Sequence, residues 1–184
     1  MKPSIVVACA VLLPFLIAAC DAKPPSPDAS VTTRSTEMKP SVTYLHLLKH
    51  TPFFTSLTTE QLRWVIGHSH EWEAQPATVV TQCDSSARGT ASYQGIWILL
   101  DGGWQIEYGQ QSYPAGHASA GKWFSATVTD RPCSLVTTEH SYVMKIERAD
   151  FDAMLEQGFA FDPHLDAGRR YYSELFAAPA ELVK

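Results

Sequence analysis

Cys20 is the residue whose position most clearly predicts chemistry. It closes the run Ile17-Ala18-Ala19-Cys20, directly after an apolar stretch from residue 5 to residue 16 with one positive charge, Lys2, near its start. A short basic end, an apolar core of about a dozen residues and small residues before the cut are typical of a secretory signal, whereas a membrane span needs about 20 apolar residues. We therefore expect residues 1–19 to be a signal peptide whose removal leaves the Cys20 thiol at the new N-terminus.

Two small residues followed by Cys at the end of such a signal resemble the bacterial lipobox, in which the Cys is lipidated. Each buried CH₂ of an acyl chain contributes about 0.8 kcal/mol, so two or more chains give stable anchoring. The resemblance implies a protein of the cell envelope held in the membrane by lipid on Cys20. Asp21 resembles the signal that retains enteric lipoproteins at the periplasmic face of the inner membrane, with the outer membrane as the alternative. An ordinary secretory signal with an incidental Cys is the simpler alternative.

The remaining cysteines allow a disulfide. Cys9 leaves with the signal and Cys20 carries lipid, so Cys83 and Cys133 remain. An even pair in an oxidising compartment suggests one disulfide, and two buried thiols are the alternative. Cys133 as a nucleophile beside His140 is a weaker hypothesis, because bridged or buried cysteines are inert.

Four histidines raise the question of a metal site. His68-Ser69-His70 is the spacing that places two imidazoles on one face of a strand, and cupin-like barrels combine such a pair with a distant Glu and His. His117 and His140 are candidate third ligands. No Glu spacing completes the pattern, so surface or capping roles are favoured, and we expect no metal, no cofactor and no catalytic residue. A cupin-like metalloenzyme using His68, His70 and His117 is kept as the alternative function.

Composition bounds the organisation and the partners. The formal net charge is −5 and basic residues do not cluster, so we expect no binding to nucleic acid. Residues 20–184 suffice for one domain. Prolines among Ser and Thr follow Cys20 and predict a flexible linker. The expected segments are the signal peptide (1–19), the lipidated Cys and linker (20–41), the folded domain (42–178) and a tail (179–184).

Helical patterns flank the folded domain. Tyr44, Leu47 and Leu48 have helical spacing, and Thr58 with Gln61 forms a capping-box pattern ahead of a helix that ends by Gly67. Phe151, Met154, Leu155 and Phe159 follow the i, i+3, i+4, i+8 pattern of a third helix. Asp162-Pro163 then opens a last helix that Pro179 stops.

Short runs typical of strands fill the middle of the chain. Asp101-Gly102-Gly103 between two of them is a strong hairpin signal. The expected strands are residues 78–81, 93–100, 104–108, 123–129, 134–138 and 142–146. The fold class is mostly β with flanking helices: a β-roll of the jelly-roll type, with two N-terminal and two C-terminal helices.

This order of elements, with its motifs, resembles the cyclic nucleotide-binding domain of catabolite-activator-type regulators. Residues 47–62 resemble the family's Pro-hydrophobic-Phe turn followed by Leu-Ser-x-Glu-x-Leu. Residues 82–84 stand where the family has a Gly-Asp/Glu turn, and residues 93–106 resemble its Tyr-x-Ile-x-x-Gly segment. Residues 141–151, which end in Arg148-Ala149-Asp150-Phe151, resemble the last strand and the Arg-x-Asp-Phe helix start. The likeness covers about residues 45–175 and implies a ligand-binding β-roll without catalytic activity.

The family binds its ligand through a cassette in which a Glu accepts from the ribose hydroxyl and an Arg pairs with the cyclic phosphate. Counting back from residues 141–151 places Arg131 on that Arg, with Pro132 and Cys133 in place of Ser/Thr-Ala. The Glu position falls on Lys122, after Gly121, or on Ala126 if residues 123–126 are aligned with the family's Trp-Phe-Gly-Glu. Both alignments lack the carboxylate, which speaks against the usual ligand. The candidate ligand-binding residues are Gly121, Lys122, Arg131 and Ser134.

The resulting expectation is a membrane-anchored, non-enzymatic module that binds a small ligand or an envelope protein rather than cAMP. A true cyclic-nucleotide sensor is the other alternative. Aromatic residues of the roll are expected to pack its core, with the lining of an apolar pocket as the alternative; they are Trp97, Trp104, Tyr108, Tyr113, Trp123 and Phe124. Tyr171 and Tyr172 lie on the last helix, the element through which relatives dimerise or cover the pocket, so a homodimer through this helix is a further expectation.

Overall fold

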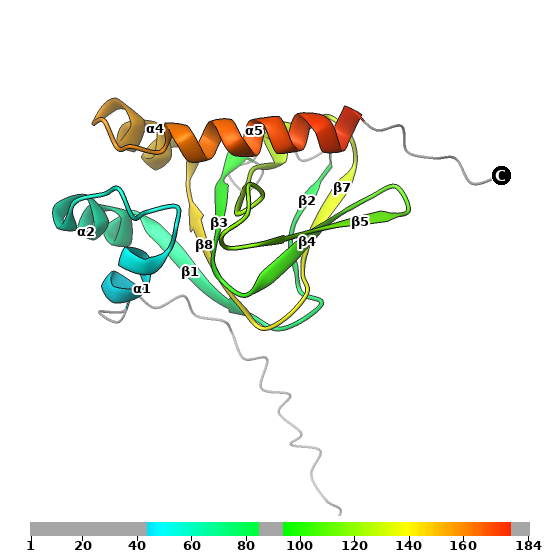
Figure 1. The fold of residues 1–184 in the computed structure, drawn as a ribbon, viewed down its shortest axis with the longest axis horizontal. Helices are drawn as coiled ribbons and strands as arrows, with labels where there is room; N and C mark the ends of the chain where they lie inside the picture. Colours follow the sequence, from blue (N-terminus) through cyan, green and yellow to red (C-terminus); the bar gives the residue numbers. More distant parts are fainter. Residues whose placement is uncertain (1–43, 85–93, 178–184) are drawn as a thin grey trace, which may run out of the picture. The chain divides into compact units, whose positions relative to one another are not determined.

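The computed structural model describes residues 44–84 and 94–177. The predicted signal peptide, Cys20, the linker up to residue 41 and the tail from residue 179 lie outside the described residues. Within the described part, two helices come first, eight strands follow, and two helices end the chain order (Figure 1). The flanking helices are as predicted, whereas the strand at residues 69–74 was not among the expected strands.

The N-terminal helices are α1 (Tyr44–His50) and α2 (Thr59–Gly67). The predicted capping box opens α2: the Gln61 N–H donates to Thr58 Oγ1 at 3.2 Å, and the Thr58 N–H donates to Gln61 Oε1 at 2.9 Å. Both otherwise unpaired donors at the helix start are thereby satisfied. Leu62 is buried against the core, so this end of the roll is closed by the apolar face of α2.

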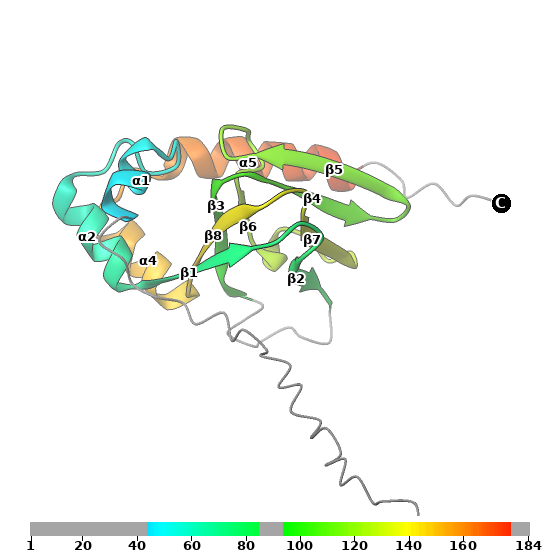
Figure 2. The ribbon, with the colours of Figure 1, turned by 90° about the horizontal axis from the view of Figure 1, so that it is seen from below.

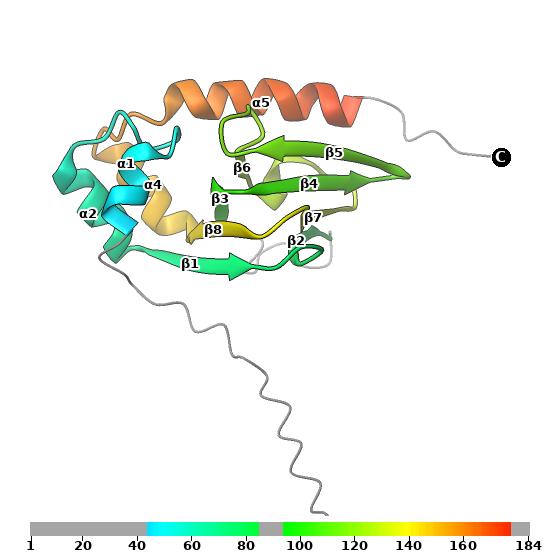
Figure 3. The ribbon, with the colours of Figure 1, turned by 60° about the horizontal axis from the view of Figure 1, so that its bottom comes forward.

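Two antiparallel four-stranded sheets form the β-roll, with strand orders β1-β8-β3-β6 and β2-β7-β4-β5. The strands are β1 (Ser69–Ala74), β2 (Val79–Cys83), β3 (Ile96–Asp101), β4 (Gly103–Tyr108), β5 (Gln111–Gly116), β6 (Trp123–Phe124), β7 (Cys133–Thr137) and β8 (Ser141–Ile146). Figure 3 shows the strands of the two sheets above one another, with α5 along one side. Buried side chains from both sheets and from the helices belong to a single core.

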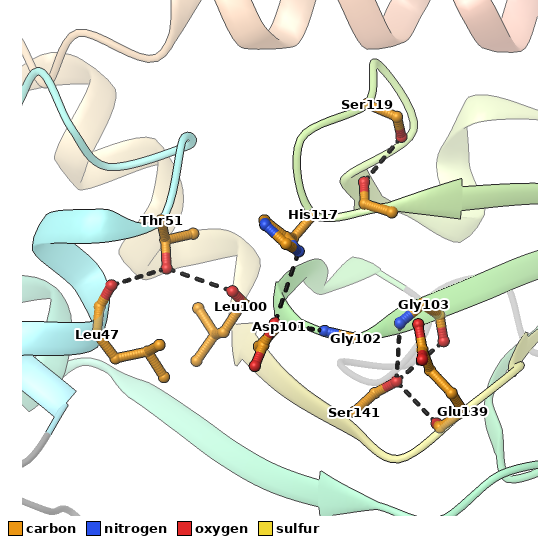
Figure 4. Close-up of polar contacts among 11 residues, drawn as sticks. Leu47, Thr51, Leu100, Asp101, Gly102, Gly103, His117, Ser119, Glu139 and Ser141 are labelled. Atoms are coloured by element: carbon orange, nitrogen blue, oxygen red, sulfur yellow. Dashed lines mark hydrogen bonds and ion pairs between the residues drawn. The ribbon is translucent and has the colours of Figure 1, made fainter.

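The turn at Asp101-Gly102-Gly103 is present, but the predicted hairpin is wrong. β3 pairs with β6 and β8, whereas β4 pairs with β5 and β7, so the turn carries the chain from one sheet to the other. Ser141 holds this crossing: its hydroxyl donates to the Gly103 carbonyl at 2.9 Å and accepts from the Gly103 N–H at 3.1 Å (Figure 4). Gly102 has φ +86°, and a Cβ there would lie 2.5 Å from Ser141 Oγ, so the close approach requires glycine.

Two further strand predictions need correction. The expected strand 123–129 ends after Phe124, because Ser125 caps a short 3₁₀ helix, η2 (Ala126–Val128), by accepting from the Thr127 N–H at 3.4 Å. The edge strand β5 was not predicted, since Pro114 and polar residues weaken its pattern. An edge position tolerates proline, because one side of an edge strand needs no donor.

The C-terminal helices are α4 (Arg148–Glu156) and α5 (Asp162–Ala177). Figures 1 and 2 show α1, α2 and α4 gathered at one end of the roll, while α5 runs along it. Gly168 brings α5 close to the roll, since a Cβ there would lie 2.2 Å from Trp123 Nε1. The same Nε1 donates to the His164 carbonyl at 2.9 Å, so α5 is fixed against β6 by shape and by a hydrogen bond.

None of the helices among the described residues is long and apolar enough to cross a membrane.

Candidate functional site

Arg131 lies in the segment before β7, where its guanidinium contacts a tyrosine. Arg131 Nη1 donates to Tyr108 Oη at 2.8 Å, and its Cζ lies 5.9 Å from the centroid of the Tyr108 ring. The Arg131 main-chain N–H donates to Thr129 Oγ1 at 3.0 Å, which orients the segment. The Tyr108 phenol therefore accepts from the Arg131 guanidinium, the group that the sequence comparison placed on a phosphate-binding position.

Tyr108 is itself held in the core. Only 5% of its surface is exposed, and its ring meets the ring of Phe176 edge-on, with centroids 5.2 Å apart. Phe176 comes from the last turns of α5. The contact joins the end of β4, the segment before β7 and the final helix at one point.

A continuous row of aromatic rings leads from this point to the other predicted site residues. We call it the aromatic row: Tyr108, Phe176, Tyr172, Phe124 and Trp123. Tyr172 meets both Trp123 and Phe124 edge-on at centroid separations of 5.6 Å, and it lies 6.5 Å from Phe176. Tyr172 Oη donates to the Trp123 carbonyl, and burial raises the pKa of Tyr172 well above its ordinary value. The prediction that the roll's aromatic residues pack its core is confirmed for Trp97, Trp104, Tyr108, Trp123 and Phe124, while Tyr113 is partly buried against that core.

Gly121 is a packing position in this arrangement. A Cβ on Gly121 would lie 2.9 Å from both Ala115 Cβ and Tyr171 Cε1, so a larger residue would push α5 away. The Gly121 carbonyl accepts from Trp104 Nε1 at 2.9 Å and from Tyr172 Oη at 3.4 Å. Its polar backbone group is thus used inside the protein.

Lys122 stands where one alignment places the family's carboxylate. The residue is 7% exposed, and its carbonyl accepts from the Leu99 N–H at 2.8 Å. Burial lowers the pKa of the Lys122 side chain, because desolvation disfavours the ammonium form. Burial and the nearby Lys122 charge also lower the pKa of His164. Ala126, the position given by the other alignment, is a buried residue of η2. Neither position therefore supplies the carboxylate that accepts from the ribose hydroxyl in the cyclic-nucleotide-binding domains.

Ser134 lies on β7, between Gln82 of β2 and Glu107 of β4. Its neighbour Leu135 is completely buried, and successive strand residues face opposite sides, so Ser134 faces away from Leu135. Gly121 and Arg131 contact two members of the aromatic row, Tyr172 and Tyr108 respectively, whereas Ser134 is on the outer side of the sheet. Its role in ligand binding stays a prediction.

The Cys83–Cys133 disulfide is present. The two residues face each other in the antiparallel register of β2 and β7, with Cα atoms 4.8 Å apart and an S–S distance of 2.00 Å. This confirms the predicted pairing and sets aside Cys133 as a nucleophile. Structural disulfides are typical of proteins outside the cytoplasm.

The histidines do not come together. His117 Nδ1 lies 3.7 Å from Asp101 Oδ1 (Figure 4), and His140 Nε2 lies 2.7 Å from Glu73 Oε1. His68 stacks on Trp64 at a centroid distance of 3.6 Å, and His70 is exposed on β1. Across residues 44–84 and 94–177, no three His, Cys, Asp or Glu side chains are grouped as a metal site. The metalloenzyme hypothesis loses its ligand set.

Phe176 is the functional neighbour that sequence reasoning missed. Its place in the apolar stripe of the last helix was visible, but nothing local indicated that it would meet Tyr108. The contact depends on how α5 lies across the roll, which Gly168 and Trp123 determine.

No family model matches the sequence, and no curated protein matches it. Three solved structures are similar. A cyclic-nucleotide-binding domain of a protein kinase A regulatory subunit bound to Sp-2Cl-cAMPS has a TM-score of 0.54 at 14% identity, over 73% of this chain and 88% of that one. The cAMP-bound PfPKA-R has a TM-score of 0.55 at 14% identity, over 73% and 45%. The regulatory subunit of a cAMP-independent protein kinase A from Trypanosoma brucei has a TM-score of 0.52 at 16% identity, over 72% and 50%.

These likenesses establish the fold: two antiparallel sheets in a roll with flanking helices, similar to cyclic-nucleotide-binding domains. The chain spans about half the length of the second and third of these proteins.

Proposed function

We propose that this chain is a non-enzymatic binding protein of the cell envelope, anchored by lipid on Cys20, whose former nucleotide site is closed to cAMP. Domains with this fold are typically binding domains without catalytic activity. The lipobox-like sequence before Cys20 supports the anchor, and the Cys83–Cys133 disulfide supports a place outside the cytoplasm. The ligand is a small molecule or an envelope protein.

The contact of Arg131 with Tyr108 carries the ligand half of the proposal. The phenol takes one of the five guanidinium donors, so a cyclic phosphate would share Arg131 with a tyrosine that is fixed against Phe176. The ribose hydroxyl would then find a buried lysine or alanine in place of a carboxylate. A polar group left without its partner in a buried site costs about 1–3 kcal/mol, which favours exclusion of the nucleotide.

The likeness to known structures is compatible with a changed ligand. Of the similar proteins, one is bound to cAMP and another is a cAMP-independent kinase regulator. The fold thus does not by itself imply cAMP binding.

Thermal unfolding with cyclic nucleotides tests the ligand half. The mature chain, and the same chain with Arg131→Ala, are melted with and without millimolar cAMP or cGMP. A ligand that binds only the folded state raises the melting temperature. We expect no shift in either protein. A shift of several degrees that disappears in Arg131→Ala would show that the site still binds nucleotide.

Mass spectrometry of the expressed protein tests the anchor half. We expect an N-terminal peptide that begins at Cys20 and carries acyl chains, in the membrane fraction. Cys20→Ala is expected to abolish the modification and release the protein, whereas Cys9→Ala, inside the predicted signal peptide, is the matched control. An uncleaved chain in the cytosol would refute the anchor.

A further inference from the structure

A cavity of about 330 Å³ lies between the 123–128 segment and the two C-terminal helices. Sites for small molecules usually measure about 300–1,000 Å³. β6 and α5, which lie beside each other in Figure 3, both contribute residues to the lining of the cavity. Seven of the twelve lining residues are aliphatic or aromatic, among them Trp123, Phe151, Leu155 and Leu165. An apolar body of moderate size fits such a space.

The charged groups of the lining are both cationic. Arg148, at the start of α4, and Arg169, on α5, line the cavity, and their side chains are 49% and 64% exposed. Their acidic neighbours, Asp152 and Asp166, are not among the lining residues. A ligand in the cavity therefore meets two guanidinium groups and no carboxylate from the lining, which favours an anion.

Both arginines have donors to offer. Arg148 contacts both oxygens of Asp152 through Nε at 2.8 Å, and Arg169 contacts Asp166 through Nη1 at 3.1 Å. A guanidinium has five N–H donors, so each of these contacts uses a minority of them. Ion pairs this exposed contribute little stability, so a ligand carboxylate can join or replace them.

Three hydroxyl groups of the lining add neutral hydrogen-bonding partners. Ser125 Oγ and Thr127 Oγ1 lie 2.9 Å apart at η2, and both residues line the cavity. Ser173, one turn of α5 beyond Arg169, lines it too and is exposed. A few polar groups around an apolar interior orient an amphiphilic ligand and not a highly polar one.

We propose that this cavity binds a small monocarboxylate with an apolar body, the carboxylate on Arg148 and Arg169 and the body against Trp123 and Phe151. The inference rests on the proposed binding function, and it gives that function a site and a ligand class. The site differs from the nucleotide position: Arg131 and Tyr108 do not line the cavity, whereas Trp123 and Tyr172 belong both to its wall and to the aromatic row.

Calorimetric titration with three probes of one chain length tests the charge preference. The protein is the mature chain with Cys20→Ala, which needs no detergent to stay in solution. The probes are decanoate, decanol and decylamine. We expect saturable binding of decanoate, with decanol at least about tenfold weaker, because an ionic hydrogen bond is lost, and no binding of decylamine. Equal binding of the three probes, or no binding of decanoate at millimolar concentration, would overturn the proposal.

Variants locate the binding site. Arg169→Gln should weaken decanoate binding about tenfold. Arg170→Gln, its exposed neighbour outside the lining, is the matched control and should leave the affinity unchanged. Ser173→Trp, an exposed position that tolerates a large side chain, should fill the mouth and abolish binding. Equal affinities of all three variants would place decanoate elsewhere and refute the site.

A titration of the same protein with cAMP separates this inference from the proposed function. If cAMP binds and decanoate does not, both the cavity proposal and the proposed exclusion of cAMP are wrong. If neither ligand binds, the cavity proposal is wrong while the proposed exclusion of cAMP stands.

Discussion

Arg131 and Phe176 approach the same tyrosine from two sides. Arg131 Nη1 donates to Tyr108 Oη at 2.8 Å, and the Phe176 ring meets the Tyr108 ring edge-on at 5.2 Å. The guanidinium and the last helix are thus coupled through one side chain of β4.

Tyr108→Phe removes the hydroxyl and keeps the ring. We expect the free energy of unfolding to fall by about 1 kcal/mol, the net value of one hydrogen bond, as measured by urea denaturation. Tyr113→Phe is the matched control, because the Tyr113 hydroxyl contacts the exposed side chain of Gln111. We expect its free energy of unfolding to change by less than about 0.5 kcal/mol. Equal losses in both variants would mean that the contact of Arg131 with Tyr108 adds no particular stability.

Gly168→Ala tests the contact between α5 and β6. The added Cβ would lie 2.2 Å from Trp123 Nε1, so α5 or the indole must shift, and we expect a loss of about 3 kcal/mol. Gly67→Ala at the end of α2 has no atom within 4 Å of the added Cβ and should be neutral or stabilising by up to about 1 kcal/mol. Thermal melts of both variants give the comparison. A neutral Gly168→Ala would show that α5 does not sit tightly on Trp123.

Much of this architecture was predictable because its signals are local. The capping box at Thr58 and Gln61, the helix start at Arg148 and the turn at 101–103 each involve residues close in sequence. Which sheet each strand joins is a long-range property, so the same turn signal predicted a hairpin where Ser141 instead holds a crossing between sheets.

The candidate site divides in the same way. The absence of the carboxylate found in cyclic-nucleotide-binding domains was visible at Lys122 and Ala126, and the even number of remaining cysteines suggested the Cys83–Cys133 bridge that the structure confirms. The partner of Arg131 was not visible, because Tyr108 reaches it only through strand pairing and the placement of α5. The homodimer through the last helix stays a prediction.

Loss of the Cys83–Cys133 disulfide should destabilise the protein strongly. The bridge joins residues 50 apart in sequence, for which chain entropy predicts about 4 kcal/mol. Cys83→Ser, Cys133→Ser and the double variant should unfold at similar, lower urea concentrations, because each lacks the same bridge. Reductant should shift the unfolding midpoint of the natural protein and leave that of the double variant unchanged. Additive losses in the double variant would contradict a bridge in solution.

The pH dependence of stability should report on Lys122. Burial lowers the pKa of Lys122 in the folded state, so the unfolded chain binds more protons between that pKa and the ordinary value. Stability should therefore rise with pH across this window. Near the upper end of this window and above it, the raised pKa of Tyr172 acts in the opposite direction, since the tyrosine of the unfolded chain ionises first.

Lys122→Met should remove this rise and stabilise the protein at neutral pH, whereas Lys49→Met, at an exposed position of α1, should keep it. Urea denaturation between neutral pH and the onset of tyrosine ionisation gives the two curves. Parallel curves for the natural protein and Lys122→Met would mean that the ammonium stays solvated.

The proposed exclusion of cAMP is tested most directly by nuclear Overhauser effects between the ring protons of Tyr108 and Phe176, recorded without and with saturating cAMP. We predict strong cross-peaks that cAMP leaves unchanged, together with unshifted guanidinium signals of Arg131. Cross-peaks that vanish on addition of cAMP, while the Arg131 signals move, would show that the roll still opens to a cyclic nucleotide.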